Sequence, residues 1–338
     1  MRRSCGIAMC GLSLLLAACY TTAPAPEPET EQKTNKDLVD FTFGWETPLT
    51  LKAETTRRVR DMGGEAREYR AEYEMEATRS DEMLRVAVDP QFQGVTGRRA
   101  NGGAGQILGT VAILAVPTMV VSPEGGFETV EELDATRDLV AKEARRAAGG
   151  GLSKKVESAL GRFLGDEVLE QRARQNWDMM VGMWAGETME IGETYESKSE
   201  QEFTLPLVGR REVTMEVEFG ALERVSCPAG TESGETGCVR ATIRSRPDVR
   251  DMKELMQKWV EEHAEIEAKR QGMATTPKIT VTEMFFRTEA TLVTEISTLR
   301  PHRLTQKRTQ RVKLRDPNGG ERAFRTVDQR TTTFSRVE

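Results

Sequence analysis

The amino-acid sequence predicts an α+β fold, in which a large, mainly antiparallel, curved sheet packs on several amphipathic helices. Apolar and polar residues alternate with a period of two near both ends of the folded region, which is typical of strands with one buried face. The middle of the chain instead repeats apolar residues every three or four positions, as amphipathic helices do. Strands, then helices, then strands again, without a regular strand–helix repeat, favour this fold over a parallel doubly wound one.

A long antiparallel hairpin is expected where the folded region begins. Residues 41–53 and 69–77 each carry apolar side chains at alternate positions, and residues 61–64 have the composition of a turn. A third strand near residues 84–88 is expected to end just before Pro90, because proline cannot donate a hydrogen bond to a neighbouring strand.

Helices are expected in the middle of the chain. Residues 152–164 and 169–184 each form an apolar stripe at helical spacing, and residues 133–147 form a weaker one that is followed by glycines. The apolar run 107–121 is interrupted by Gly109 and Pro117, so we interpret it as a buried strand or as a flap over a cavity.

The second half of the chain returns to strand patterns. Residues 213–219 alternate between apolar and polar, and Pro247 and Asp248 precede an apolar stripe that predicts another helix. Three strands are then expected to close the chain, at about residues 279–299, 303–314 and 321–334.

Aromatic residues are few, so the core can be predicted from where they lie. Those on the apolar faces of the expected helices and of the opening hairpin should meet between sheet and helices, since each large side chain is worth roughly 1.5–3 kcal/mol when buried. They are Phe41, Phe43, Tyr69, Tyr73, Trp177, Trp184 and Trp259. The opposite parity of the hairpin, with Glu68, Glu72 and Glu76, should lie outside this core.

The first eighteen residues have the composition of a signal peptide. Arg2 and Arg3 precede a short apolar stretch, which ends in Leu16, Ala17 and Ala18 before Cys19. Leu-Ala-Ala-Cys closely resembles the lipobox of bacterial lipoproteins. This resemblance implies that the signal is removed before Cys19 and that a diacylglyceryl group is attached to the Cys19 thiol. Two or three acyl chains make such an anchor effectively permanent.

Residues 19–37 are expected to be a spacer between the lipidated Cys19 and a single α+β domain over residues 38–338. The segment is rich in Thr, Pro, Ala and Glu, a composition that cannot bury a core. In lipoproteins of the enterobacterial type, aspartate after the lipidated cysteine favours retention in the inner membrane. Tyr20 occupies this position in the present chain, which implies localisation to the outer membrane of the cell envelope, with the body facing the periplasm or the surface.

Two further cysteines predict a disulfide. Cys5 and Cys10 belong to the signal peptide and Cys19 to the lipobox, which leaves Cys227 and Cys238 in an oxidising compartment. The intervening residues are turn formers between two strand-like segments, so a hairpin loop closed by a disulfide is favoured. A reactive thiol pair and a metal site are the rival interpretations. The spacing is not that of a redox motif, and no histidine lies near enough in sequence to complete a zinc site.

The charge distribution limits the choice of partners. The formal net charge is −6, which argues against nucleic acid as a partner, because phosphate neutralisation needs an excess of Lys and Arg. Residues 185–223 hold ten Glu against three basic residues, whereas residues 299–338 hold eleven basic against four acidic residues. If strands from the two segments share a sheet face, we expect their charges to pair across it. The alternative interpretation is a basic surface that faces an anionic envelope polymer or lipid headgroup.

No catalytic residues, metal ligands or cofactor are predicted. His263 lies on an apolar helical stripe, as core histidines do, and His302 lies at a strand boundary. Neither accompanies a nucleophile, zinc-protease or phosphate-loop motif. A pair of carboxylates that meets only in space is the one enzymatic alternative left open.

Two non-enzymatic functions are therefore weighed for a membrane-anchored envelope lipoprotein. The first is the binding of an apolar ligand such as lipid, for which the order of elements resembles the half-barrel periplasmic carriers of the LolA and LppX type. Methionines on the helical faces would suit an adaptable cavity lining, although core packing explains them equally; they are Met179, Met180, Met183, Met252 and Met256. The second is an envelope scaffold, with a protein partner and no small ligand.

Overall fold

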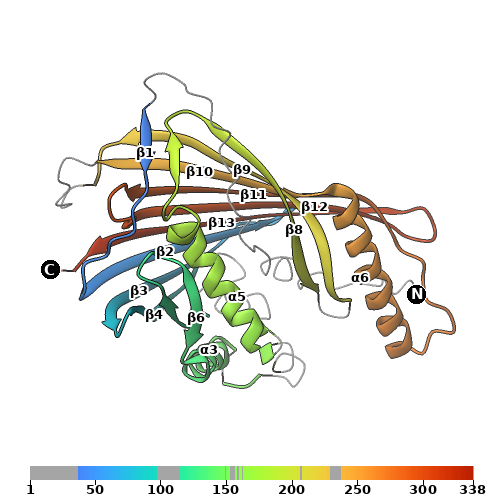
Figure 1. Cartoon of the computed structure of the whole chain (residues 1–338). Helices are drawn as coiled ribbons and strands as arrows, with labels where there is room; N and C mark the ends of the chain where they lie inside the picture. Colours follow the sequence, from blue (N-terminus) through green and yellow to red (C-terminus); the bar gives the residue numbers. More distant parts are fainter. Residues whose placement is uncertain are drawn as a thin grey trace.

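The computed structural model describes residues 37–337, except for 97–114, 149, 153–156, 158–159, 162, 206–207 and 229–236. Its main feature is an 11-stranded sheet in the order β6-β5-β4-β3-β2-β13-β12-β11-β10-β9-β8 (Figure 1). The strands are β2 (Leu49–Asp61), β3 (Arg67–Ser80), β4 (Met83–Thr96), β5 (Thr118–Val121), β6 (Phe127–Glu131), β8 (Thr194–Leu205), β9 (Gly209–Val225), β10 (Cys238–Pro247), β11 (Thr280–Glu295), β12 (Pro301–Arg315) and β13 (Glu321–Arg336). Two short strands, β1 (Leu38–Asp40) and β7 (Thr188–Glu190), pair separately.

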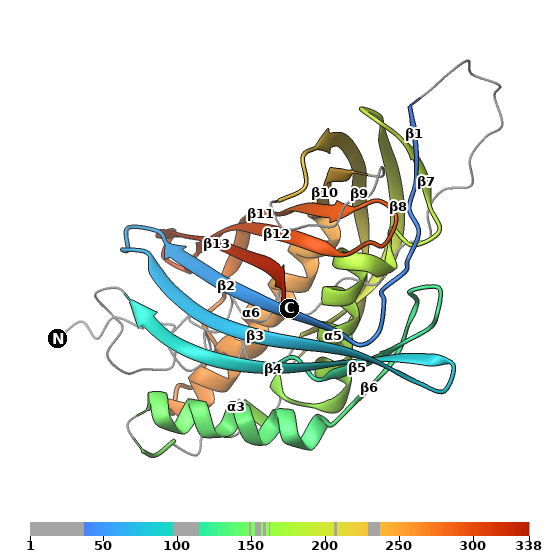
Figure 2. The same cartoon turned by 90° about the vertical axis from the view of Figure 1, so that its left-hand side faces the viewer.

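Each pair of neighbouring strands is antiparallel, and the long strands bend around the helices (Figure 2). The predicted α+β class with a large, mainly antiparallel sheet is therefore confirmed. The described residues include three α-helices, fewer than the sequence suggested: α3 (Leu133–Ala147), α5 (Asp166–Trp177) and α6 (Val249–Arg270). Among those residues, no helix is both long and apolar enough to cross a membrane.

The opening hairpin has the predicted register. Ala53 lies opposite Tyr73 and Glu54 opposite Glu72, so the apolar parity of both strands shares one face. Tyr73 is buried on that face while Glu72 lies half-buried on the other, as the period of two requires.

The first and the last strand of this sheet in chain order pair with each other in its middle. β2 pairs with β13 along eleven residues, and the buried hydroxyl oxygens of Thr55 and Thr332 lie 2.7 Å apart. This pairing joins the strands of the first half to those of the second half in one continuous sheet.

The helices lie within the curve of the sheet (Figures 1 and 2). α6 begins where the sequence predicted, because the Asp248 carboxylate accepts hydrogen bonds from the backbone N–H groups of Arg250 and Asp251. α5 continues into a short π-helix, η2 (Asp178–Gly182), which contacts β11 and β12. The predicted helix 152–164 falls largely outside the described residues.

The predicted aromatic core is confirmed. Six of the seven aromatic residues named above are buried in one hydrophobic cluster, and Phe43 packs against it half-buried. The Trp177 indole lies edge-on to the Trp45 ring, with 5.4 Å between ring centroids. Its N–H donates a hydrogen bond to the Gly125 carbonyl oxygen at 2.7 Å, so the polar atom of this buried ring is satisfied.

Three local expectations were wrong. The chain around Phe41 is not part of β2, since its backbone bonds instead to Glu187 and Gly186 beside the π-helix. β4 continues through Pro90, because β5 pairs only with its first residues and leaves that stretch at the described edge of the sheet. Strands of the acidic and basic segments share the sheet but, in the part of the chain that is described, they do not lie side by side as charge pairing across them requires: β10 and β11 separate β9 from β12, and β10 arginines pair with the β9 glutamates.

Candidate functional site

Polar side chains interrupt the apolar inner face of the sheet at its centre. On β12 and β13 the inward parity begins and ends with apolar residues, but between them it carries charged and amide groups. Asp328 lies directly opposite Arg308, and Arg330 lies opposite both Gln306 and Arg57, so these groups form a compact cluster on three neighbouring strands. A polar cluster on a face that packs against helices needs partners within the protein or a ligand.

α5 covers this cluster and leaves a partly open cavity of about 70 Å³ beside it. The helix contributes the polar side chains of Arg172 and Gln175, which lie on its buried stripe, and of Asn176, which is half-buried beside it. Ten residues line the cavity: Arg57, Ala115, Arg172, Gln175, Asn176, Met179, Gln306, Arg308, Asp328 and Arg330.

One ion pair lies at the wall of this cavity. Arg57 is buried and donates two hydrogen bonds to the Asp328 carboxylate, from Nη2 at 2.6 Å and from Nε at 3.0 Å. Burial would raise the pKa of Asp328, but the charge and hydrogen bonds of Arg57 and the charges of Arg308 and Arg330 hold it below its usual value. Asp328 is therefore a carboxylate that neutralises one of the arginines around it.

Arg172 has no such partner. Its side chain lies on the buried face of α5, the whole residue is 8 % exposed, and its Nη1 has no hydrogen-bond partner within the described ranges. Burial lowers the pKa of Arg172 to about 10, and repulsion from Arg57 and Arg308 adds to that effect. A guanidinium stays protonated at neutral pH even so, and the charge is thus held among other positive charges.

A second cavity, of about 50 Å³, adjoins the first and is mostly apolar. Asn176 and Arg330 line both cavities, so the two are neighbours under the same helix. The remaining walls are Ala53, Tyr73, Met75, Val88, Val116, Met119, Met180, Leu304, Thr332 and Phe334.

The predicted methionine lining is thus present only in part. Met179 faces the polar cavity and Met180 the apolar one, both from the π-helix. Met252 and Met256 are buried on α6, away from both cavities, and Met183 packs half-buried against the core. No sequence pattern distinguished these roles, because all five methionines occupy apolar helical faces.

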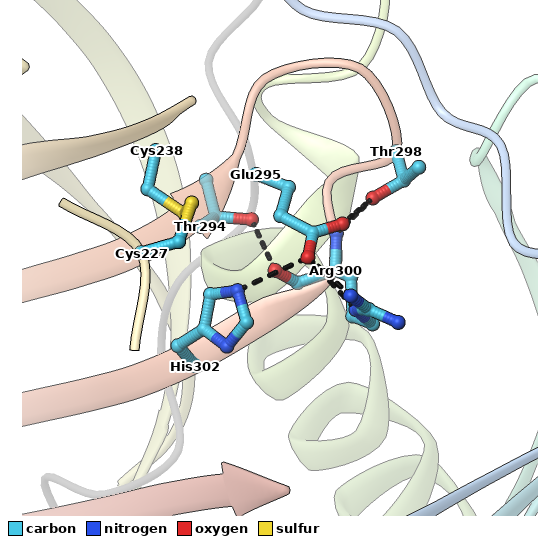
Figure 3. Close-up of a disulfide and its surroundings, with 7 residues drawn as sticks. All are labelled: Cys227, Cys238, Thr294, Glu295, Thr298, Arg300 and His302. Atoms are coloured by element: carbon cyan, nitrogen blue, oxygen red, sulfur yellow. Dashed lines mark hydrogen bonds and ion pairs between the residues drawn. A yellow bond between two sulfur atoms is a disulfide. The ribbon is translucent and has the colours of Figure 1, made fainter. Parts of the chain in front are cut away.

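The predicted disulfide is confirmed (Figure 3). Cys227 and Cys238 are bonded, and their Cα atoms lie 5.1 Å apart, within the range usual for disulfides. Cys238 is the first residue of β10 and lies opposite Val225, the last residue of β9, so the bond closes the loop between these two strands as expected.

A buried glutamate lies beside the disulfide. Glu295 ends β11 and accepts hydrogen bonds from Thr298 Oγ1 at 2.6 Å and from Arg300 Nε at 3.0 Å, while His302 Nε2 lies 3.2 Å from it (Figure 3). Burial would raise the pKa of Glu295, but the hydrogen bonds from His302, Thr298 and Arg300 lower it to about 2. This cluster holds the turn between β11 and β12.

The structure brings His302 closer to the cysteines than the sequence suggested. One ring nitrogen of His302 and the two sulfur atoms lie within 4.8 Å of one another, although His302 belongs to β12. The register of β10, β11 and β12 creates this proximity, which sequence spacing does not encode. Bonded cysteines have no thiolate to offer a metal, so the oxidised site is a structural one.

Neither the protein-family models nor the curated proteins contain a match to this chain.

The remaining residues named from the sequence lie elsewhere. His263 stacks on Trp259 of the same helix, with 5.2 Å between ring centroids, in keeping with a packing role. Cys19, with the signal peptide and spacer, lies outside the described residues. The cavity residues Arg57, Arg172, Arg308 and Arg330 were missed, but one sequence pattern marked some of them. Arg57 and Arg308 occupy the parity that is apolar towards the ends of their strands.

Proposed function

We propose that this chain is a lipid-anchored, non-catalytic protein of the cell envelope that binds an apolar or amphiphilic ligand, such as lipid, between its sheet and α5. The observation that carries the proposal is the pair of adjoining cavities on the inner face of the sheet, one polar and one apolar. Small-molecule sites are typically concave and mostly apolar, with a few polar groups that orient the ligand.

The segment above the cavities is suited to adapt to a ligand. The π-helix carries Met179 and Met180, one facing each cavity. Methionine side chains are flexible and polarisable, and π-helical turns frequently occur at functional sites. A volume of about 50 Å³ accommodates only a short apolar group, so a whole acyl chain requires α5 and the π-helix to move away from the sheet.

Recovery of ligand from the purified protein tests this binding function. Native mass spectrometry after mild extraction should detect lipid bound to the wild-type chain. Ala53→Leu should reduce the bound fraction, because the added atoms occupy the apolar cavity that Ala53 lines. Ala323→Leu, on β13 but away from both cavities, serves as the matched control. Lipid recovered equally from all three proteins would contradict the proposed location.

The anchor is tested separately. Metabolic labelling with a palmitate analogue should mark the wild-type chain and leave Cys19→Ser unlabelled, because Leu-Ala-Ala-Cys resembles a lipobox, whose cysteine would carry the lipid. Equal labelling of both chains would refute the anchor and, with it, the outer-membrane address.

An envelope scaffold is the second candidate, and the small volume of the apolar cavity favours it. A scaffold should be recovered without lipid and with a protein partner. The same mass spectra therefore decide between the two functions.

A further inference from the structure

The polar cavity under α5 carries a large excess of positive charge. Among the described residues, four guanidinium groups line it, those of Arg57, Arg172, Arg308 and Arg330, whereas Asp328 is the one carboxylate. One positive charge is neutralised in the Arg57–Asp328 pair, and three remain. The stretch 97–114 leads into the lining residue Ala115 and contains no acidic residue in its sequence, so it has no carboxylate to offer.

Burial makes this excess unusual. Arginine is almost never fully buried without a partner, because removing a charge from water is costly. Arg172 is nonetheless buried on α5, and the charges that act on it within the described structure are those of Arg57 and Arg308, both positive. The other buried positions of α5 are occupied by Leu169, Ala173, Gln175 and Trp177, so Arg172 is the one charged residue among the buried side chains of this helix.

Three buried hydrogen-bond donors in and beside this cavity lack a partner in the described structure. Arg172 Nη1, Arg330 Nε and Gln310 Nε2 are all buried, and none of them has a hydrogen-bond partner among the residues described. Arg172 and Arg330 line the cavity, and Gln310 lies on the same face of β12 as the lining residues Gln306 and Arg308. A group that satisfies all three must accept hydrogen bonds, and the surrounding excess of arginines favours an acceptor that carries negative charge.

We propose that this cavity binds the anionic group of an amphiphile, a phosphate or a carboxylate, with Arg172 as its central contact. The inference rests on the proposed function, because the apolar part of the same molecule would enter the adjoining cavity across the shared residues Asn176 and Arg330. Guanidinium groups suit this role, since their planar donors match the oxygens of phosphate and carboxylate. A phosphate monoester, with up to two negative charges, suits three unneutralised arginines best.

Isothermal titration of the purified chain with three probes tests the anionic site. Dodecyl phosphate carries both parts of the expected ligand, 1-monolauroylglycerol carries a similar chain without the charge, and inorganic phosphate carries the charge without the chain. Each amphiphile is used below its critical micelle concentration. Wild-type protein should bind dodecyl phosphate about tenfold or more tighter than 1-monolauroylglycerol, because charged hydrogen bonds are the stronger ones.

Two variants and a control locate the site. Arg172→Gln should weaken binding of dodecyl phosphate by roughly 10- to 100-fold and leave binding of 1-monolauroylglycerol nearly unchanged. Arg308→Gln removes a half-buried lining charge and should weaken the same probe, which keeps the test valid if the first variant folds poorly. Arg303→Gln, exposed on the other face of β12, should bind like wild type.

The outcomes separate the two proposals. If both amphiphiles bind equally and neither cavity variant alters affinity, the anionic site is overturned while the apolar ligand function stands. If inorganic phosphate binds as tightly as dodecyl phosphate and is lost in Arg172→Gln, the anionic site is supported and the apolar function is overturned. If no probe binds to any protein, both proposals are overturned.

Discussion

Replacing Arg172 with methionine should raise the free energy of unfolding of the ligand-free protein, the opposite of what most buried substitutions do. Burial lowers the pKa of this guanidinium from 12.5 to about 10. At about 1.4 kcal/mol per pH unit, the folded state therefore loses about 3 kcal/mol by holding the charge. Methionine has a similar length and no charge. Its introduction leaves no carboxylate without a partner, because Arg172 has no acidic partner among the described residues. We expect a gain of about 1–3 kcal/mol.

Urea denaturation in phosphate-free buffer, followed by the fluorescence of the four tryptophans, measures this change. Both states carry the charge at all pH values well below the folded pKa of about 10, so the gain should be equal at pH 6 and pH 8. Arg303→Met, on the exposed face of β12, should change stability by less than about 0.5 kcal/mol. Arg57→Met should instead destabilise by about 3–5 kcal/mol, because it leaves the Asp328 carboxylate buried without its partner. A loss at Arg172 as large as that at Arg57 would refute the view that Arg172 is electrostatically uncompensated.

Three further outcomes follow from other buried groups. Glu295→Gln should lower the free energy of unfolding by about 3 kcal/mol at neutral pH, because the pKa of Glu295 is lowered to about 2. Measured by acid unfolding, the difference in stability from wild type should vanish as the pH falls from about 4.5 to 2. A difference that persists at pH 2 would contradict this. Burial raises the pKa of Asp178 to about 7, although the charge of Arg174 opposes this shift. The free energy of unfolding of the wild type should therefore decrease as the pH rises from about 4 to 7, and Asp178→Asn should remove that slope. Identical pH profiles for the two proteins would argue against it. Reduction of the Cys227–Cys238 bond, which closes a short loop, should cost about 2–3 kcal/mol in urea with dithiothreitol, and an unchanged midpoint would show that the bond contributes nothing.

Local patterns predicted most elements of this fold. The period of two placed Tyr73 inside and Glu72 outside, and Asp248 marked the start of α6 correctly because a capping carboxylate acts within one helical turn. The pairing of β2 with β13 was not predictable in this way, since any strand with one apolar face satisfies the same pattern. Pro90 misled the prediction for β4, because the restriction on proline depends on whether a neighbour is present.

The cavity depends on just that long-range pairing. Arg57, Arg172 and Arg330 are separated by more than a hundred residues of sequence, and only the closure of the sheet and the placement of α5 bring them together. The sequence feature that could have indicated a polar site was a charged residue in the inward parity of a strand, as at Arg57 or Arg308. The sequence could not say whether such a residue meets a carboxylate, as Arg57 does, or other arginines, as Arg172 does.

The seam between β2 and β13 has a consequence for how the chain reaches its native state. During synthesis, which begins at the amino end, β2, β3 and β4 are complete long before β13 has been made. Thr55 therefore cannot contact its partner Thr332 until 277 more residues have been added. Until then β2 exposes a bare row of N–H and C=O groups, which is a template for pairing with another chain. Contacts this remote also slow folding. A chaperone that binds this chain before its synthesis is complete should therefore recognise the unpaired edge of β2. Deletion of β13 should likewise lead to aggregation rather than to a smaller folded domain.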